Sequence, residues 1–192
     1  VLFRSSIHRI LITHDHADHI KSVGSMSYDF KLPVYATREV HRGIDHNYCV
    51  QRKVAADMKR LLIPGESQRI GDFMVTPFSV PHDASENVGY QIDVEGVSFV
   101  IITDVGSATE EVRKRISLAH YLILEANHDV EMLTNGPYPA YLKKRILSSN
   151  GHLSNAECGQ AIAENMTERL RNVWLCHLSE ENNHPELARK TV

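Results

Sequence analysis

The chain carries, close to its first residue, the segment Ile10-Leu11-Ile12-Thr13-His14-Asp15-His16-Ala17-Asp18-His19. An apolar run that ends in Thr and then in Asp and His is typical of a buried strand that runs out into a loop. Imidazole and carboxylate groups are the ligands that suit Zn, Mn and Fe at catalytic sites. A solvated polar loop is the alternative, but the order H-x-H-x-D-H favours metal binding. We expect His14 and His16 to share one ion, and Asp18 and His19 to bind a second.

The composition is that of an ordinary globular protein. Of the 192 residues, 42% are hydrophobic and 23% are charged, and the net charge is −3. This length predicts a single domain, residues 1–192, and the charge gives no global basic field that would indicate a nucleic-acid binder. No apolar stretch approaches the length of a membrane span. The three cysteines form no C-x-x-C pair, which favours a reducing compartment.

The start of the chain predicts a truncated protein. The sequence begins without Met, and Val1-Leu2-Phe3-Arg4-Ser5 resembles translated sequencing-adapter read-through. We therefore expect residues 1–5 to be non-native and an amino-terminal portion of the protein to be missing.

Strands and helices follow one another along the rest of the chain. Apolar and β-rich runs predict strands at residues 31–36, 73–80, 88–94, 97–104, 121–125 and 173–176. Amphipathic or capped stretches predict helices at 20–28, 38–44, 109–119 and 139–147, from Ser154 onward, and after Pro185. Ser154 and Glu157 predict a capping box, and the following helix is expected to bury Ile162, Ala163, Met166 and Leu170. Residues 45–62 are mixed and basic, and we predict a solvated helix face there rather than a specific binding patch.

Three later strands also end in residues that bind metals, namely His82, Asp104 and His177. Taken alone, each histidine is more often structural and the aspartate is often a cap, but loops at strand ends are where sites lie on a rigid sheet. Together with the first motif they give the full ligand set of a two-metal hydrolase: His14, His16 and His82 on one ion, Asp18, His19 and His177 on the other, and Asp104 bridging. Two such ions would lower the pKa of a bridging water and hold both oxygens of a displacement.

Seven segments carry a resemblance to a known family: Ile12-Thr13-His14-Asp15-His16-Ala17-Asp18-His19, His82-Asp83-Ala84, Thr103-Asp104-Val105-Gly106, Leu124-Glu125-Ala126-Asn127-His128-Asp129, Gly136-Pro137-Tyr138-Pro139, Gly151-His152-Leu153-Ser154-Asn155, and His177-Leu178-Ser179 with Asn182-Asn183. On these residues the chain resembles metallo-β-lactamase-fold hydrolases, and more closely the YycJ/WalJ (VicX) subfamily of bacterial phosphodiesterases. The resemblance implies an α/β fold, an αββα sandwich with a dinuclear metal site at the strand ends. It also implies 5′-to-3′ DNA exonuclease activity in the bacterial cytoplasm. Members of the family have a hairpin and a strand before the first histidine motif, so the first strands of the domain are expected to be absent here.

Residues outside the ligand set are predicted to contact the substrate. His152 precedes the helix N-cap Ser154 by two residues, and helix N-termini attract anions. With Ser154 and Asn155, His152 is expected to hold the scissile phosphate and to protonate the leaving oxygen, unless it only caps its loop. Lys143 and Lys144, followed by Arg145, are expected to contact a nucleic-acid backbone, with a solvated face as the alternative.

We predict supporting roles for further aromatic and polar side chains. Tyr138 and Tyr141 are candidates for stacking on bases. His128 and Asp129 follow a predicted strand and are expected to orient metal ligands from the second shell, or else to form a structural turn.

The sequence thus predicts a metal-dependent phosphodiester hydrolase, a 5′-to-3′ DNA exonuclease that uses a hydroxide bridging two metal ions. Asp18 and His152 are its predicted catalytic residues, and the two ions are Zn, Mn or Fe, among which His/Asp sites do not discriminate. DNA is the predicted partner, with no membrane contact and no protein partner that the sequence indicates. Two alternatives remain open: a small-molecule hydrolase of the same fold that acts on a cyclic phosphodiester, thioester or lactam, and an inactive scaffold fragment.

Overall fold

The computed structural model describes residues 7–192, so the segment predicted to be non-native lies outside the described residues. Within this range, no helix is both long enough and apolar enough to cross a lipid bilayer. The chain divides into two compact units. Unit 1 comprises residues 7–66 and Ala84–Asn87, and unit 2 comprises Ser67–Asp83 and Val88–Val192. The prediction of one domain over residues 1–192 stays a prediction.

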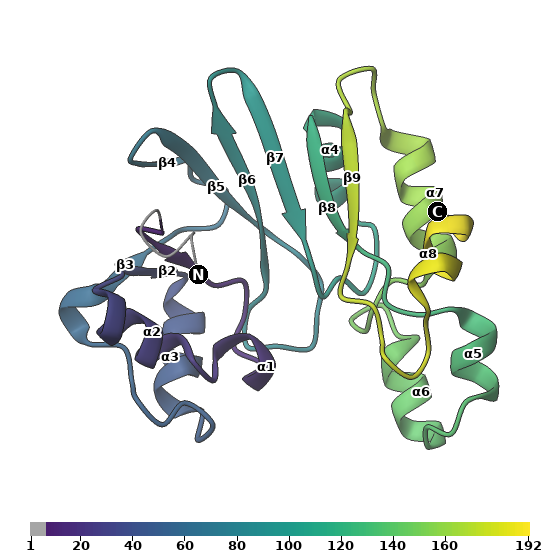
Figure 1. Ribbon diagram of the computed structural model, residues 1–192, viewed down its shortest axis with the longest axis horizontal. Helices are drawn as coiled ribbons and strands as arrows, with labels where there is room; N and C mark the ends of the chain where they lie inside the picture. Colours follow the sequence, from purple (N-terminus) through teal and green to yellow (C-terminus); the bar gives the residue numbers. More distant parts are fainter. Residues whose placement is uncertain (1–6) are drawn as a thin grey trace. The chain divides into compact units, whose positions relative to one another are not determined.

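Unit 1 is built on a three-stranded parallel sheet of order β1-β2-β3 (Figure 1). Its elements are β1 (Ile10–Leu11), α1 (Ala17–Ile20), α2 (Val23–Phe30), β2 (Val34–Ala36), α3 (Arg38–His46), the 3-10 helix η2 (Ala56–Met58) and β3 (Lys59–Leu61). Thr37 caps α3 by accepting a hydrogen bond from the Val40 N–H, as its sequence predicts. The core of the unit joins apolar side chains of the helices to those of the central strand: Ile20, Val23, Val40, Ile44, Val34 and Ala36.

Unit 2 is built on a six-stranded sheet of order β4-β5-β6-β7-β8-β9. Its elements are β4 (Gln68–Ile70), β5 (Phe73–Ser79), β6 (Val88–Val94), β7 (Val97–Ile102), α4 (Glu110–Leu118), β8 (Tyr121–Glu125), α5 (Val130–Asn135), α6 (Ala140–Ile146), α7 (Asn155–Asn165), β9 (Asn172–Cys176) and α8 (Pro185–Thr191). The strands from β4 to β7 are antiparallel, whereas β7, β8 and β9 run parallel. The carboxyl ends of these three strands therefore lie side by side at one edge of the sheet.

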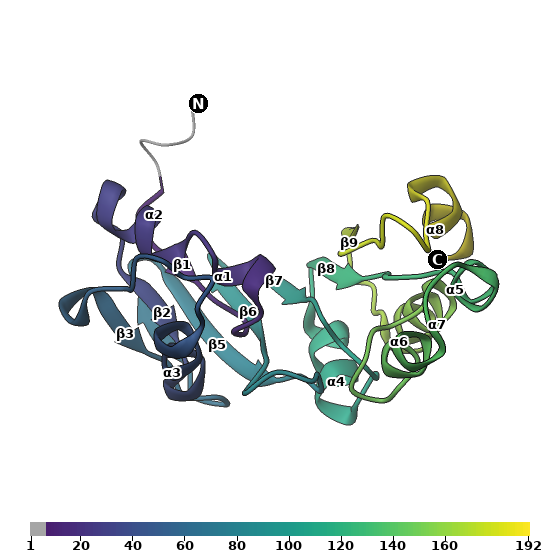
Figure 2. The ribbon, with the colours of Figure 1, turned by 90° about the horizontal axis from the view of Figure 1, so that it is seen from below.

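Helices α4 and α7 cover one face of this parallel part of the sheet (Figure 2). Buried side chains of both helices pack on alternate residues of β7 and β8: Val112, Ile116, Cys158, Ala161, Ile162, Val100, Ile102, Leu122 and Leu124. Alternate residues of a strand point to the same face, so this apolar layer fixes the register of the strand ends.

Most elements predicted from periodicity and capping are confirmed, including the hairpin of β6 and β7 and the capping box of Ser154 and Glu157. The predicted solvated helix over residues 45–62 is wrong, because β3 lies there. This strand is polar because it is at a sheet edge, and among residues 7–192 it pairs only with β2. The buried stripe predicted for α7 is wrong at Ala163 and Met166, which are exposed, whereas Leu170 is half-buried and packs against the core from beyond the helix. The helix ends at Asn165, and Met166 is 56% exposed.

The two cysteines of unit 2 should resist alkylation while the protein is folded. Burial raises the pKa of the Cys158 thiol and of the Cys176 thiol to about 12, and the thiolate is the reactive form. Brief treatment with iodoacetamide at pH 8, followed by peptide mass spectrometry, should therefore modify neither residue until urea is added. Modification of both in the native protein would contradict this burial.

Candidate metal centre

The histidine motif of unit 1 forms a compact group that extends from the loop after β1 into helix α1. The ring centroid of His14 lies 4.7 Å from that of His16 and 4.2 Å from that of His19. His14 is buried, and Asp18 lies in the first turn of α1, with its Oδ2 3.6 Å from His19 Nε2. The four predicted ligands of this motif thus lie close together within the unit.

Asp15, which was not predicted to have a role, fixes this loop. Its carboxylate accepts hydrogen bonds from the Ser85 backbone N–H at 3.3 Å and from the Ser85 hydroxyl at 2.6 Å. Its backbone carbonyl accepts a hydrogen bond from the Asn47 amide at 3.2 Å. A Cβ atom at Gly43 would lie 2.0 Å from Asp15 Oδ2, so only glycine leaves room for the carboxylate there.

Three carboxyl ends of parallel strands bring Asp104, Glu125 and His177 together in unit 2. Asp104 follows β7 by two residues, Glu125 is the last residue of β8, and His177 comes directly after β9. Asp104 and His177 both have a φ of 53°, in the left-handed region that few residues other than glycine adopt. Backbone strain of this kind costs about 1–3 kcal/mol for each residue and is concentrated at functional sites.

Three histidines flank the Asp104 carboxylate, one of them His152, whose Nδ1 lies 3.9 Å from Asp104 Oδ1. His82 Nε2 lies 3.7 Å from Asp104 Oδ1, and His177 Nε2 lies 3.4 Å from the same oxygen. The other ring nitrogen of His82 lies 3.0 Å from the Gly151 carbonyl, which can only accept, so Nδ1 carries the proton. Burial lowers the pKa of His82, which favours the neutral form of the ring that binds metals. This arrangement is compatible with the predicted role of Asp104 as a carboxylate that bridges two metal ions.

Glu125, which the sequence did not single out as a site residue, is the fully buried centre of the cluster. Its Oε1 accepts hydrogen bonds from His152 Nδ1 at 2.8 Å and from His177 Nδ1 at 2.6 Å. Its Oε2 accepts hydrogen bonds from the backbone N–H groups of Val105 at 2.9 Å and Leu153 at 3.3 Å. Burial alone would raise the pKa of Glu125, but the hydrogen bonds from the two imidazoles outweigh it, and the pKa is lowered. An ionised Glu125 thus directs the Nε2 atoms of both rings outward.

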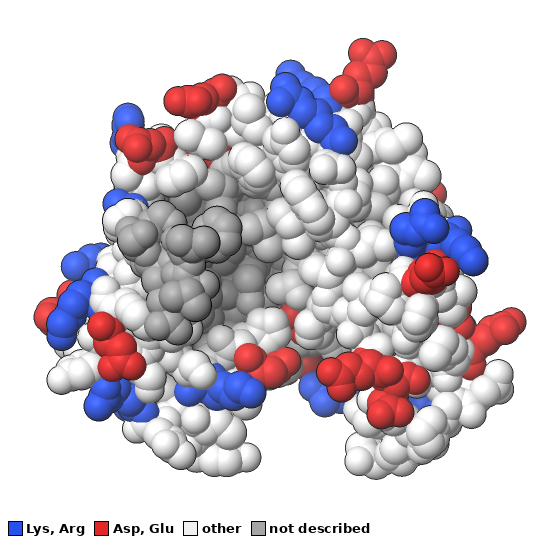
Figure 3. All heavy atoms as spheres, viewed as in Figure 1, with Lys and Arg blue, Asp and Glu red and all other residues white. Residues whose placement is uncertain are grey.

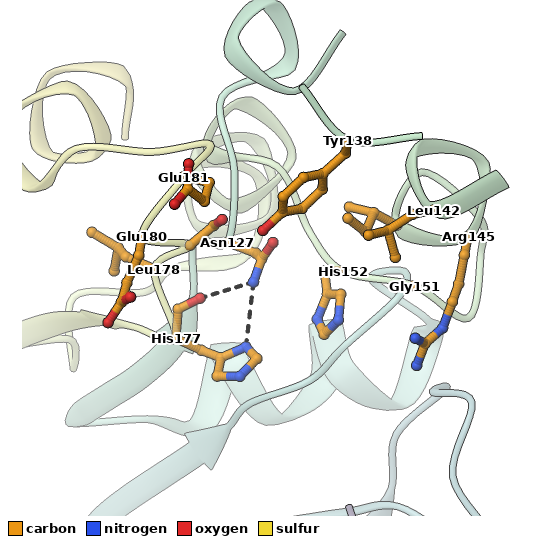
Figure 4. Close-up of a pocket in the computed structure, with 12 residues that line it drawn as sticks. Asn127, Tyr138, Leu142, Arg145, Gly151, His152, His177, Leu178, Glu180 and Glu181 are labelled. Carbon is orange, nitrogen blue, oxygen red and sulfur yellow. Dashed lines mark hydrogen bonds between the residues drawn. The ribbon is translucent and has the colours of Figure 1, made fainter. Parts of the chain in front are cut away.

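A pocket with a volume of about 400 Å³ opens beside this cluster (Figure 4). His152, His177 and Asn127 lie on one side of it, and Tyr138 and Arg145 reach toward it from other parts of the unit. Its full lining is Asn127, Tyr138, Leu142, Arg145, Ile146, Gly151, His152, His177, Leu178, Ser179, Glu180 and Glu181. The size is that of a small-molecule site.

The predicted substrate residues are not all at this pocket. His152 lines the pocket, but the Ser154 side chain is engaged in the capping box. Asn155 is buried, and its side-chain amide donates a hydrogen bond to the Asn183 side chain. Lys143 donates a hydrogen bond to the Thr134 carbonyl at 2.7 Å, and neither it nor Lys144 is among the lining residues. Of the basic run on α6, only Arg145 lines the pocket.

The two residues predicted to support ligands have separate environments. The Asp129 carboxylate caps α5 by accepting a hydrogen bond from the Met132 N–H at 3.0 Å. The His128 side chain is buried, and among residues 7–192 neither of its ring nitrogens has a hydrogen-bond partner. Burial lowers the pKa of His128. Their role as second-shell residues stays a prediction.

The sequence held a signal for Glu125 that was available without the structure. Its strand, Tyr121-Leu122-Ile123-Leu124-Glu125, is otherwise apolar, and an acidic residue that closes a buried strand must find donors. Nothing comparable marks Asp15, whose partner Ser85 is distant in sequence. Arg145 lines the pocket, and the two lysines before it do not, because of the way helix α6 is rotated about its axis. A run of three cations in the sequence does not reveal this rotation.

Comparisons with known proteins identify the family of the chain. The model of the beta-lactamase superfamily domain matches residues 3–177. Exodeoxyribonuclease YycJ of Bacillus anthracis is 37% identical over 183 residues, which are 95% of this chain and 68% of that protein. Exodeoxyribonuclease WalJ of Streptococcus pneumoniae is 36% identical over the same shares of both chains.

Solved structures share the fold at lower identity. Zn²⁺-bound PqqB from Methylobacterium extorquens has a TM-score of 0.70 at 20% identity, over 92% of this chain and 64% of that one. The metallo-beta-lactamase fold protein YhfI from Bacillus subtilis also has a TM-score of 0.70, at 19% identity over 99% of this chain and 73% of that one. The chain belongs to the metallo-β-lactamase-fold superfamily and, within it, to the family of YycJ and WalJ. The predicted α/β class of fold is thereby confirmed, and the protein is a metal-dependent hydrolase.

The residues present fit divalent metal ions. In unit 2, ligand atoms of Asp104, Glu125, His152 and His177 lie within 4.8 Å of one another. Glu125 already accepts four hydrogen bonds, so its role is to orient the rings of His152 and His177. The side chains of Asp104, His82 and His177 offer oxygen and nitrogen ligands of the type that Zn and Mn prefer. The histidine group of unit 1 offers the same chemistry.

Replacing Glu125 by Gln should destabilise unit 2 and release both rings. An amide keeps the shape, but its NH₂ group cannot accept a hydrogen bond. A backbone N–H group cannot become an acceptor, whereas an imidazole can change its tautomer, so the NH₂ group should face the two rings and end their hydrogen bonds from Nδ1. We expect a loss of about 1–3 kcal/mol in the free energy of unfolding, measured with urea. Imidazole ¹⁵N spectra should show a changed tautomer at His152 and His177.

The matched control is Glu164→Gln on the exposed part of α7, which should change the free energy of unfolding by no more than about 0.5 kcal/mol. Equal stability and unchanged tautomers in Glu125→Gln would show that the buried carboxylate does not hold the rings.

Replacing Gly151 by Ala should displace His152. A Cβ atom at this position would lie 2.1 Å from the Ile146 carbonyl oxygen and 2.4 Å from that of Arg145. The clash is with backbone, so the loop must move, and the hydrogen bond from the His152 N–H to the Ile146 carbonyl should be lost. We expect a loss of about 1–3 kcal/mol in unfolding free energy and faster exchange of the His152 amide hydrogen.

Gly159→Ala in α7 is the control, because its Cβ atom would meet only the last residues of the chain, at 3.2 Å or more. Its exchange rates near residue 152 should match those of the unaltered protein. The same rates in Gly151→Ala would mean that the loop does not depend on glycine.

Proposed function

We propose that the protein is a metal-dependent phosphodiester hydrolase that removes nucleotides from DNA ends, in the 5′-to-3′ direction. The single observation that carries this proposal is the position of His152 and Arg145 at one pocket beside the carboxylate and histidine cluster of unit 2. A cation and a titratable ring next to metal ligands suit a phosphate better than an uncharged carbonyl group. The names of the relatives YycJ and WalJ, both exodeoxyribonucleases, support DNA as the substrate.

The proposal keeps the predicted ligand set, which consists of His14, His16, Asp18, His19, His82, Asp104 and His177, with two divalent ions among Zn, Mn and Fe. Such ions lower the pKa of water and stabilise negative charge on phosphoryl oxygens. Asp18 remains a proposed catalytic residue on the basis of its motif. A location in the bacterial cytoplasm is part of the same proposal, because Cys49, Cys158 and Cys176 are all free thiols.

His152 is the proposed general acid in this scheme. Its Nδ1 is fixed by the buried Glu125 carboxylate at 2.8 Å, which leaves Nε2 as the atom that can exchange a proton with the leaving oxygen. Histidine suits this task because its ordinary pKa lies close to neutrality. Glu125 acts through His152 and His177 and is therefore a positioning residue.

A small-molecule hydrolase is the second candidate, and the surface charge favours it. Lys and Arg side chains alternate with Asp and Glu over the described residues on the face drawn in Figure 3, without an extended basic tract. The net charge of −3 points the same way, since duplex binding usually relies on many phosphate contacts. A cyclic phosphodiester, a thioester or a lactam would then be the substrate.

One assay separates these functions. The purified protein, loaded with Mn or Zn, is given 5′-phosphorylated duplex DNA, single-stranded DNA, a chromogenic phosphodiester and a chromogenic lactam. Release of mononucleotides from DNA, abolished by EDTA, is the expected result. Turnover of the phosphodiester or the lactam, without turnover of DNA, would contradict the DNA exonuclease and support the small-molecule hydrolase. Bound metal with no turnover of any substrate would indicate an inactive scaffold.

Replacing His152 by Ala should lower DNA turnover by about 10²–10⁴-fold, the usual contribution of a general acid, while metal content measured by atomic emission is kept. His46→Ala, which removes an exposed histidine at the end of α3, is the control and should leave both unchanged. Loss of metal in His152→Ala would instead make His152 a ligand.

A further inference from the structure

The pocket beside His152 contains a charged group that metal binding and proton transfer leave unused, the guanidinium of Arg145 on α6. Its side chain is 53% exposed and lines the pocket together with His152. Lys144, the preceding residue of the same helix, is exposed and does not line it. Only one cation of the basic run is therefore placed to meet a ligand in this pocket.

Asp83 holds Arg145 in this position. The Arg145 Nε–H and Nη2–H groups both donate to the Asp83 carboxylate, the second at 3.1 Å. This side-on pair engages two of the five N–H donors of a guanidinium and fixes its plane. The donors on the other edge keep the fork geometry that matches phosphate oxygens. Because Asp83 follows His82 directly, the same loop positions a predicted metal ligand and the partner of Arg145.

We propose that Arg145, positioned by Asp83, binds the terminal phosphate of a DNA strand, and that the pocket holds the terminal nucleotide of that strand. This inference rests on the proposed function, because it takes DNA as the substrate and adds the group that selects its end. The pocket volume of about 400 Å³ is that of a small-molecule site and suits one nucleotide of the strand.

Tyr138 supplies a surface for the base. Its ring projects toward the pocket, with the hydroxyl group directed at Asn127, and Leu142 lies on the same side (Figure 4). Stacking of a base on an aromatic ring contributes about 1–3 kcal/mol and does not depend on the base. Tyr141 is 75% exposed and does not line the pocket, so only one of the two tyrosines can have this role.

The opposite side of the pocket is acidic. Glu180 and Glu181 lie across from Arg145 in Figure 4, and both are exposed. Two carboxylates repel a further phosphate, so a strand that continued past this pocket would be disfavoured there. The charges thus favour a strand end with one phosphate, next to Arg145, over the middle of a strand.

A binding experiment with the metal-loaded protein tests the two contacts separately. Calorimetry compares a deoxynucleoside 5′-monophosphate with the same deoxynucleoside. Arg145→Gln should raise the Kd of the monophosphate at least tenfold and leave that of the nucleoside unchanged. Asp83→Asn should act in the same direction with a smaller effect. Tyr138→Ala should weaken both ligands. Lys144→Gln and Tyr141→Ala are the matched controls and should bind as the unaltered protein does.

A kinetic experiment connects this contact to the reaction. Duplex DNA with a 5′-phosphate should have a lower KM than the same duplex with a 5′-hydroxyl, and Arg145→Gln should remove the difference between the two KM values. Equal KM values in the unaltered protein, with monophosphate binding insensitive to Arg145, would overturn the inference and leave the DNA hydrolase standing. Binding that depends on Arg145, without any DNA hydrolysis, would support the nucleotide pocket and overturn the proposed function.

Discussion

A buried negative charge organises unit 2. Removing a carboxylate from water costs several kcal/mol unless its oxygens are fully satisfied, and Glu125 is satisfied by two imidazoles and two backbone N–H groups. These donors come from the end of β7, from the loop before α7 and from the end of β9. If any of these segments moved, the buried Glu125 carboxylate would lose a hydrogen bond, so the position of all three is fixed by this charge. The orientation of His152 and His177 follows from this requirement and not from contacts at the surface.

The strand ends on either side of Glu125 are strained, and the strain has a use. A left-handed φ at Asp104 and at His177 turns each side chain toward the shared edge immediately after its strand. The apolar layer under α4 and α7 holds the parallel strands in register, so the cost is met by burial elsewhere in the unit. The result is a set of donors arranged before any ligand arrives, which is the condition for tight and specific metal binding.

The sequence predicted what depends on local chemistry. Strands ending in His82, Asp104 and His177 were recognisable because an apolar run followed by a metal-binding residue is a local pattern. The roles of Asp15, Glu125 and Arg145 depend on partners 20 to 70 positions away, as in the bond of Val105 to Glu125 or of Ser85 to Asp15. The N-terminus of α7 was also predicted correctly, yet its Ser154 hydroxyl serves the capping box, because a side chain that completes a cap has no hydrogen bond left for a phosphate.

The hydrogen bonds between Asp15 and Ser85 also set an order of events during synthesis. The strands and the core of unit 1 lie within residues 7–66, but Ser85 follows only after β4 and β5 have been made. The loop that carries His14 and His16 thus acquires two of its hydrogen bonds across a separation of 70 residues. Closing a loop of that length is slow relative to local folding. On a translating ribosome the histidines are consequently exposed to the metal pool of the cell before their loop is fixed.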